Sequence, residues 1–348
     1  MRRVLWSHAP ALDGSNGIMS RNVHLTIATT DYDHVRDFRL GDVRAEGIDT
    51  TWLTMDIHEI FSRFTMNREW QVSELSFAKF IAQATRPDAD IVGLPVYLSR
   101  MFRFSSFYIN RKSGIREPRD LAGKRIGVSE WAQTATVYMR GWLQHDVGVP
   151  LTGIEWVQAG TEEAGREEKV ELNLPAGLRL TVANDKTLSG MLASGEVDAV
   201  MVARQPKVFL QKHPDVARLF PDYLAAERDY FATSRVYPIM HIVAMRKDVL
   251  RDNPWIARNL FHAFEESRRR SIDRFKTSAL SLYPLPGVTQ YAGALEEMAG
   301  GDFFPYGIEA NRRTLEVFLQ YAHEQGLAHR LVKPEDIFPK DIEMAVRV

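Results

Sequence analysis

Residues 113–128, SGIREPRDLAGKRIGV, decide the fold class of this chain. They place a turn, a short capped helix, a second turn and an apolar strand in succession. Residues 188–202, LSGMLASGEVDAVMV, supply a helix, a glycine that stops it and another apolar strand. This spacing is typical of a βαβ unit. Together the two stretches predict a cleft between two α/β lobes, of which the second spans residues 112–237.

The first lobe is expected to be discontinuous, with residues 21–111 and 238–348 lying on either side of the second lobe in the sequence. Each lobe is predicted to be a mixed β-sheet flanked by helices. The stretches that predict the elements of the first lobe are residues 23–28 (first strand), 239–245 (return strand), and 253–275 and 312–325 (amphipathic C-terminal helices packed on this lobe). Residues 1–20 are predicted to be a flexible leader.

The composition excludes several classes of function. The chain has 348 residues, which is long for one hydrophobic core and sufficient for two lobes. Its 44 basic and 45 acidic side chains give a net charge of −1, so nothing favours binding to nucleic acid or to an anionic membrane. There is no cysteine, which rules out disulfides, thiolate metal sites and a cysteine nucleophile. No secretory signal or membrane span is recognised, so a cytoplasmic location is predicted.

A polar cluster follows the first predicted strand, where α/β folds place ligand-binding groups. Asp31 or Asp33 beside His34 can hold the imidazole in one tautomer and raise its basicity, as a proton donor near neutral pH requires. The same aspartates are equally suited to capping a helix, which would leave His34 incidental. Arg36 in this segment is a candidate contact to a bound substrate.

Arg100 and Arg103 lie three residues apart among apolar neighbours. Because guanidinium groups fork onto carboxylates, the pair is a candidate for binding an aromatic acid. Surface or interlobe salt bridges explain the same pattern equally well. Arg204, in a strand-to-helix turn further along the chain, is a third candidate of this kind.

A strand ends and a helix begins within residues 127–135. The free backbone N–H groups there and the Thr134 hydroxyl suit an anionic group, although Thr134 is also a plausible helix cap. Gln133 is a further candidate contact. Glu130 in the same turn would repel an anion unless it takes a proton or meets a hydroxyl group.

Three more candidates lie on predicted strands. Glu74 and Ser76 come at the end of one strand and are chosen for that position. His241 lies in the apolar return strand, where a lone histidine is more often a hydrogen-bonded core residue than a functional one.

Six segments of the chain, in the same order and spread over residues 23–335, resemble the 4,5-dihydroxyphthalate decarboxylase family. They are residues 31–34, 72–76, 95–103, 162–169, 237–241 and 305–312. The resemblance implies a two-lobed fold of the type II periplasmic-binding-protein-like superfamily. It also implies the conversion of 4,5-dihydroxyphthalate to protocatechuate and carbon dioxide, a reaction that is chemically reasonable without a cofactor. The chain departs from the family pattern at Phe104, where the family has histidine, and at residues 131–134, where it has Tyr-Gln-Met-Thr. Both places are predicted to line the cleft.

A substrate of this kind has a ring hydroxyl para to a carboxylate. Protonation of the carbon that bears the carboxylate gives a dienone, which takes up the electrons when carbon dioxide leaves. On this basis, Arg100, Arg103 and Arg204 are predicted to bind a carboxylate, with help from Thr134. His34, oriented by Asp33 or Asp31, is the predicted proton donor, and His241 is the second choice. Glu74 is predicted to polarise a ring hydroxyl.

Two rival hypotheses remain open. One is a solute-binding protein without chemistry, for an aromatic acid or a thiamine-precursor-like ligand. The other is a metal-dependent decarboxylase, although no metal motif of specific spacing is present and a site would have to be assembled from Asp31, Asp33, His34 and His241. Assembly into a homo-oligomer is also left open.

Overall fold

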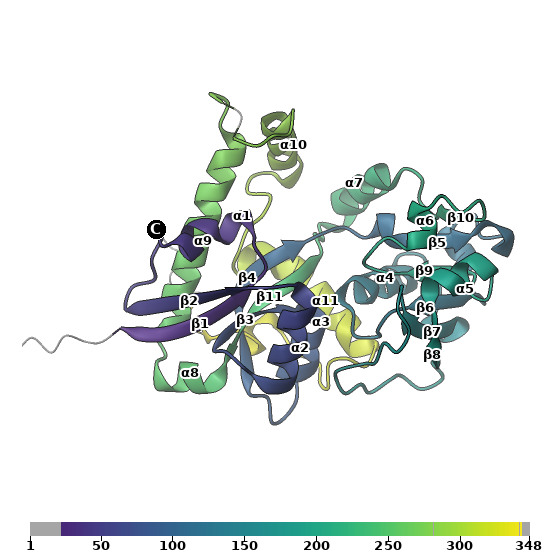
Figure 1. Ribbon diagram of the computed structural model, residues 1–348, viewed down its shortest axis with the longest axis horizontal. Coiled ribbons are helices and arrows are strands. Elements are labelled where there is room, and N and C mark those ends of the chain that lie inside the picture. Colours follow the sequence, from purple (N-terminus) through teal and green to yellow (C-terminus); the bar gives the residue numbers. More distant parts are fainter. Residues whose placement is uncertain (1–21, 281, 341, 343–348) are drawn as a thin grey trace, which may run out of the picture.

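The chain folds around two mixed β-sheets, each of which is the centre of one lobe (Figure 1). The computed structural model describes residues 22–280, 282–340 and 342, so the predicted leader lies outside the described residues. Within them, the strand order of the first sheet is β2-β1-β3-β11-β4, and that of the second sheet is β10-β5-β9-β6-β7-β8. The predicted α/β class with two lobes is confirmed.

The first sheet combines an early and a late part of the chain. Its strands are β1 (Val23–Thr29), β2 (Ile48–Thr54), β3 (Val72–Ser76), β4 (Ile91–Arg100) and β11 (Ile239–Arg246). β1 is parallel to β2 and β3, whereas β11 is antiparallel to β3 and β4. The helices α1 (Asp33–Leu40), α2 (Ile57–Asn67) and α3 (Phe77–Ala84) connect its early strands. Every residue of β3 is buried, as expected for a central strand covered on both faces.

The second sheet contains the two stretches that predicted the fold. Its strands are β5 (Phe107–Asn110), β6 (Arg125–Val128), β7 (Glu155–Gly160), β8 (Arg179–Thr187), β9 (Ala199–Met201) and β10 (Val216–Arg218). Its helices are α4 (Thr134–His145), α5 (Leu188–Ser194), α6 (Lys207–Leu210) and α7 (Tyr223–Ser234). β6 pairs in parallel with β9. Glycine is required at position 127 because a Cβ there would lie 2.6 Å from the Leu188 side chain of α5.

One predicted lobe boundary is wrong. β5 pairs with β9 and β10 of the second sheet, so the chain crosses between lobes at residues 101–106 and not at 111. The crossing comes early because β5 finds its hydrogen-bonding partners in the second lobe. The chain returns to the first sheet at β11.

The C-terminal helices are α8 (Lys247–Asp252), α9 (Ile256–Lys276), α10 (Val288–Ala299) and α11 (Arg312–Glu324). α9 packs on α1 of the first lobe, where the Phe264 and Phe38 rings are 5.1 Å apart. α11 instead lies between the lobes (Figure 1), because the Phe318 ring is 4.4 Å from Phe77 of α3 and 4.8 Å from Tyr138 of α4. The prediction that both helices pack on the first lobe alone is therefore wrong for α11.

Residues 161–178, between β7 and β8, form a long loop that we call the bridging loop. It leaves the second lobe and contacts the first. Lys169 Nζ lies 3.1 Å from the Ser62 hydroxyl of α2, and the Asn173 N–H donates to the Gly326 carbonyl at 2.8 Å. The bridging loop thus carries charged side chains to the junction between the lobes.

Candidate functional site

Glu74 is a fully buried carboxylate at the junction end of β3. It accepts three hydrogen bonds, from the Thr30 N–H at 2.7 Å, the Tyr32 hydroxyl at 2.6 Å and His241 Nδ1 at 2.6 Å. Thr30 and Tyr32 follow β1, and His241 lies near the start of the antiparallel strand β11. The carboxyl ends of parallel strands are where α/β folds bind ligands, so this group lies where a site is expected.

His241 presents one ring nitrogen away from this carboxylate. Its Nδ1 is bonded to Glu74, and among the described residues Nε2 has no hydrogen-bond partner. The side chain is 15% exposed, and the Phe61 ring of α2 meets it edge-on with centroids 4.9 Å apart. A carboxylate bonded to one ring nitrogen fixes the tautomer, which leaves Nε2 available for proton transfer.

Burial and hydrogen bonding set the charges of this group. Burial by itself raises the pKa of Glu74. The hydrogen bond and charge of His241, together with the hydrogen bonds from Thr30 and Tyr32, outweigh this effect and hold the pKa of Glu74 below its usual value. Burial and the adjacent negative charge raise the pKa of the Tyr32 hydroxyl well above its ordinary range. Glu74 is therefore ionised and Tyr32 remains a proton-bearing donor to it.

His34 is enclosed by aromatic rings. Its ring centroid is 5.1 Å from both Tyr32 and Phe304 and 6.3 Å from Tyr306. Part of the residue reaches the surface, but Nε2 is buried and has no partner among the described residues. Burial lowers the pKa of His34 to about 4. His34 is thus neutral near pH 7, and its free nitrogen is shielded, so its geometry suits proton donation less well than that of His241.

The two aspartates predicted to orient His34 are bonded elsewhere, and that part of the prediction is wrong. Asp33 Oδ2 accepts from Ser271 at 2.5 Å, Tyr283 at 2.9 Å and Arg274 at 3.2 Å, which ties α1 to the end of α9 and the segment after it. Asp31 pairs with Arg39 at 2.8 Å. Adjacent positions in the sequence here point in different directions. The candidate Arg36 is exposed on α1.

Arg100 is a structural residue in this arrangement. Its guanidinium donates to the Tyr237 carbonyl at 2.9 Å and lies 4.5 Å from the centre of the Tyr237 ring. Burial lowers its pKa. The side chain joins the end of β4 to the return crossing through backbone carbonyls, and its buried Nε has no hydrogen-bond partner among the described residues.

Arg103 and Arg204 lie at the junction. Arg103 donates to the Ala203 carbonyl of the second lobe at 3.2 Å and lies 3.2 Å from the sulfur of Met240 in β11. Burial lowers its pKa to about 10, and none of the ion pairs formed by the described residues includes it. Arg204 is 66% exposed and lies 3.8 Å from Asp56, across the junction.

Thr134 joins the two lobes. Its hydroxyl lies 2.9 Å from the Ser76 hydroxyl and accepts the Ala78 N–H at 3.0 Å. The first residue of α4 therefore caps the beginning of α3 in the other lobe, a role that local sequence could not reveal. The neighbouring Gln133 has a buried side-chain oxygen without a partner among the described residues.

Several charged side chains that the sequence analysis missed surround Glu130. We call this set the interlobe cluster; it consists of Lys79, Glu130, Arg166, Glu168 and Lys169. Lys79 Nζ is 2.7 Å from Glu130 Oε2, and Arg166 Nε is 2.5 Å from Oε1. Although burial raises the pKa of Glu130, the two cations hold it below its usual value. The cluster was missed because residues 162–169 have the composition of a solvated surface loop.

His58 was also missed. It lies in the first turn of α2, three residues before Phe61 and therefore on the same helix face. Burial and then the positive charges of Arg166 and Arg204 lower its pKa. The only signal in the sequence was its place just after the capping residue Asp56.

Phe104 and Trp131, two of the residues at which the chain departs from the family pattern, do not line the junction. The Phe104 ring packs in the second lobe against Trp142 at 4.9 Å, Phe220 at 5.1 Å and Tyr230 at 5.5 Å. Trp131 is fully buried and donates to the Gln325 carbonyl at 2.8 Å. The prediction that these two side chains face the ligand is wrong, since both belong to aromatic packing.

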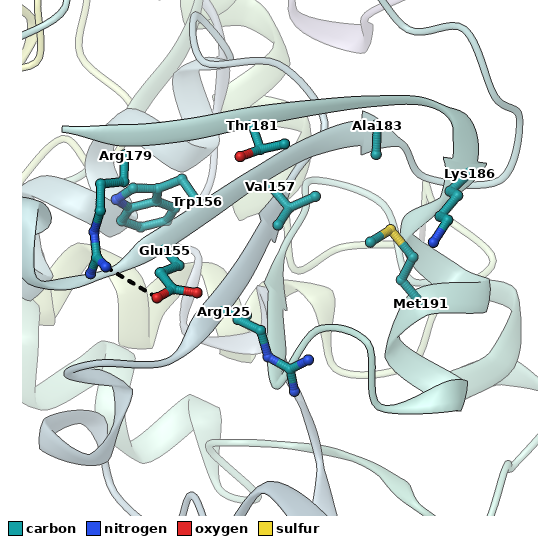
Figure 2. Close-up of a pocket in the computed structure, with 9 residues that line it drawn as sticks. All are labelled: Arg125, Glu155, Trp156, Val157, Arg179, Thr181, Ala183, Lys186 and Met191. Carbon is teal, nitrogen blue, oxygen red and sulfur yellow. Dashed lines mark hydrogen bonds and ion pairs between the residues drawn. The ribbon is translucent and has the colours of Figure 1, made fainter.

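A surface hollow of about 410 Å³ lies elsewhere, on one face of the second sheet. Figure 2 shows Arg125, Glu155 and Arg179 side by side where β6, β7 and β8 begin. Ligands of α/β folds bind at the opposite, carboxyl ends of parallel strands. None of the candidate residues lines this hollow, so we place the site at the junction.

The described residues contain no group of three or more histidine, cysteine, aspartate or glutamate side chains that could hold a metal ion. None of the helices they form combines the length and apolar character needed to cross a bilayer. In the arginine run at 268–270, Arg268 is buried and pairs with Glu265 and Asp302.

The fold is that of the periplasmic binding proteins. A periplasmic sulfonate-binding protein from Methylobacillus flagellatus superposes with a TM-score of 0.52 at 13% identity, over 93% of both chains. The periplasmic aliphatic sulphonate binding protein of Escherichia coli gives 0.51 at 13% identity, over 92% of this chain and 99% of that one. At such identities the likeness shows the fold alone.

Sequence comparison identifies the family within this fold. No family model matches the chain. The 4,5-dihydroxyphthalate decarboxylase of Comamonas testosteroni is 34% identical over 323 residues, which cover 92% of this chain and 98% of that protein. The enzyme of the same name from Pseudomonas putida is 39% identical over 62% of this chain and 83% of its own length. The chain belongs to the 4,5-dihydroxyphthalate decarboxylase family, which consists of carboxy-lyases.

Proposed function

We propose that the protein decarboxylates 4,5-dihydroxyphthalate to protocatechuate and carbon dioxide at the junction between its lobes, without a cofactor. The observation that carries the proposal is the buried Glu74 carboxylate bonded to His241 Nδ1. The resulting histidine has its proton-donating nitrogen directed away from the carboxylate and lies at the ligand-binding end of the first sheet. The names of the two relatives supply the substrate.

The proposed chemistry is a proton transfer to carbon. Loss of the proton from the ring hydroxyl para to the departing carboxylate enriches that ring carbon in electrons. His241 Nε2–H then gives its proton to this carbon, and a C–H bond forms in a dienone. When the C–CO2 bond breaks, its electron pair returns to the ring and the oxygen takes back a proton. His241 regains its proton from water, so one proton is consumed for each carbon dioxide released.

The other groups at the junction fit a substrate that is a dianion. Arg103 is a half-buried cation outside the ion pairs of the described residues, and it touches both lobes through Ala203 and Met240. Two-lobed proteins of this kind open and close around ligands. Ties such as Ser76–Thr134 correspond in this proposal to the closed arrangement.

The test is incubation of chelator-treated protein with 4,5-dihydroxyphthalate and a panel of hydroxylated benzoates. Carbon dioxide release and the aromatic product are followed together. Stoichiometric release with protocatechuate as product is expected for the wild type, and His241→Asn should reduce turnover by about 10²-fold or more. Tight binding without release would instead identify a solute-binding protein, and activity that needs added metal would refute the cofactor-free reaction.

A further inference from the structure

The interlobe cluster holds more positive than negative charge. Lys79, Arg166 and Lys169 all act electrostatically on each other or on Glu130. Among the described residues, Glu130 is the one carboxylate that pairs with the charged groups of these side chains, and it pairs with Lys79 and Arg166. Within the same residues, Lys169 Nζ is bonded only to the neutral Ser62 hydroxyl. A partly buried cation without a carboxylate partner is costly unless an anion is supplied.

Glu168 does not supply that charge. Its Oε2 accepts the Ala132 N–H at 3.0 Å, and its Oε1 accepts the Lys169 backbone N–H at 3.2 Å. Its charge acts on Lys79 and on Arg140, which is fully buried and donates to Gln325 and to a backbone carbonyl. Both oxygens of the Glu168 carboxylate thus accept from backbone N–H groups, and none of the ion pairs between described residues joins Glu168 to Lys169.

The two accessible cations of the cluster are Lys169, which has no carboxylate partner among the described residues, and Arg166, which shares Glu130 with Lys79. Lys79 and Glu130 side chains are 7% and 2% exposed, whereas Arg166 is 32% exposed and Lys169 is half-buried. Both belong to the bridging loop. They face helix α2, where Lys169 bonds to Ser62 and the charge of Arg166 acts on His58. Phe61, on the same turn of α2, contacts the proton-donor candidate His241. An anion bound by this pair would therefore lie on the α2 side of the junction.

We propose that Arg166 and Lys169 of the bridging loop form the anchor for the carboxylate that the substrate retains after decarboxylation; this inference rests on the proposed function. A cation bonded to the departing carboxylate would stabilise the charged ground state more than the transition state, in which that charge is being lost. A cationic anchor therefore favours the reaction only when it holds the other carboxylate.

The anchor can be tested without turnover, by ligand competition. Protocatechuate keeps the retained carboxylate and catechol lacks it. Their inhibition or dissociation constants with the full chain are compared at fixed ionic strength. We expect the wild type to prefer protocatechuate by about tenfold or more, the effect of one charge-assisted hydrogen bond. Lys169→Met and Arg166→Met should each reduce this preference to about threefold or less. Lys169→Arg should keep most of it.

The matched control is Lys112→Met, which removes an exposed lysine of the second lobe paired with Asp215, and it should leave the preference unchanged. Unchanged preference in both Lys169→Met and Arg166→Met would overturn the inference, as would a wild type that does not prefer protocatechuate. A lower melting temperature with unchanged preference would show that the cluster only ties the lobes. If Lys169→Met does not fold, Arg166→Met and Lys169→Arg decide the question. Failure of the proposed function is a separate result, because it appears as absence of carbon dioxide release from the wild type.

Discussion

Replacement of Glu74 by glutamine tests the proposed proton donor most directly. The carboxylate accepts three hydrogen bonds of 2.6–2.7 Å in a fully buried place. A glutamine side chain of the same size offers one oxygen and one NH2 group. The Thr30 N–H is fixed in the backbone and bonds to Oε2, whereas Tyr32 and His241 Nδ1 share Oε1. If the glutamine oxygen stays on Thr30, its NH2 group faces both Tyr32 and His241. These two donors then lose their acceptor, unless His241 changes tautomer.

The expected effects follow from these three bonds. Loss of one buried hydrogen bond to a charged group lowers the free energy of unfolding by about 1–3 kcal/mol. Turnover should fall by about 10²-fold or more, because proton donation by a well-placed side chain contributes that much.

The assay measures kcat and KM between pH 5 and 9, together with denaturant unfolding of each variant. The matched control is Glu155→Gln, the same change at a 52% exposed carboxylate that pairs with Arg179 beside the hollow in Figure 2. It should leave both turnover and stability nearly unchanged. Turnover of a folded Glu74→Gln variant within about threefold of the wild type would refute the reasoning.

Two further predictions concern residues singled out in the sequence. Arg103→Gln should raise KM by about tenfold with little loss of stability. Arg100→Gln should mainly lower the melting temperature, because Arg100 donates to backbone carbonyls. The reverse pattern in steady-state kinetics and melting curves would contradict this assignment. The pKa of His34 is about 4 in the folded protein and near 6.5 when unfolded, so the unfolded chain binds more protons between these values. The contribution of neutral His34 to the free energy of unfolding is present above pH 6.5 and is lost as the pH falls toward 4. His34→Gln should therefore flatten the dependence of this free energy on pH in that window. An unaltered slope of unfolding free energy against pH would argue against a buried neutral His34.

The local elements were largely predictable. The apolar stretches at 23–28 and 239–245 form strands β1 and β11, since periodicity acts within a few residues. Glu74 was also named from its place at a strand end, a position rule that holds for α/β sheets in general, whereas His241 was named as a lone histidine in the apolar return strand. The functional pairing of the two was not predictable in the same way, because 167 residues separate them.

The sequence by itself determined the two-lobed α/β architecture and the candidate polar residues, because apolar periodicity, glycine stops and strand ends are local features. Only the tertiary structure decided which charges meet. Asp33 is adjacent to His34 but bonds to α9, whereas Glu74 meets His241 from a distant strand. The bridging loop has the composition of a solvated segment, yet it brings Arg166 and Lys169 to the junction. The physical reason is that burial makes an unpaired charge costly, so the partner of a charged side chain is chosen by how distant segments pack and not by its neighbours in sequence.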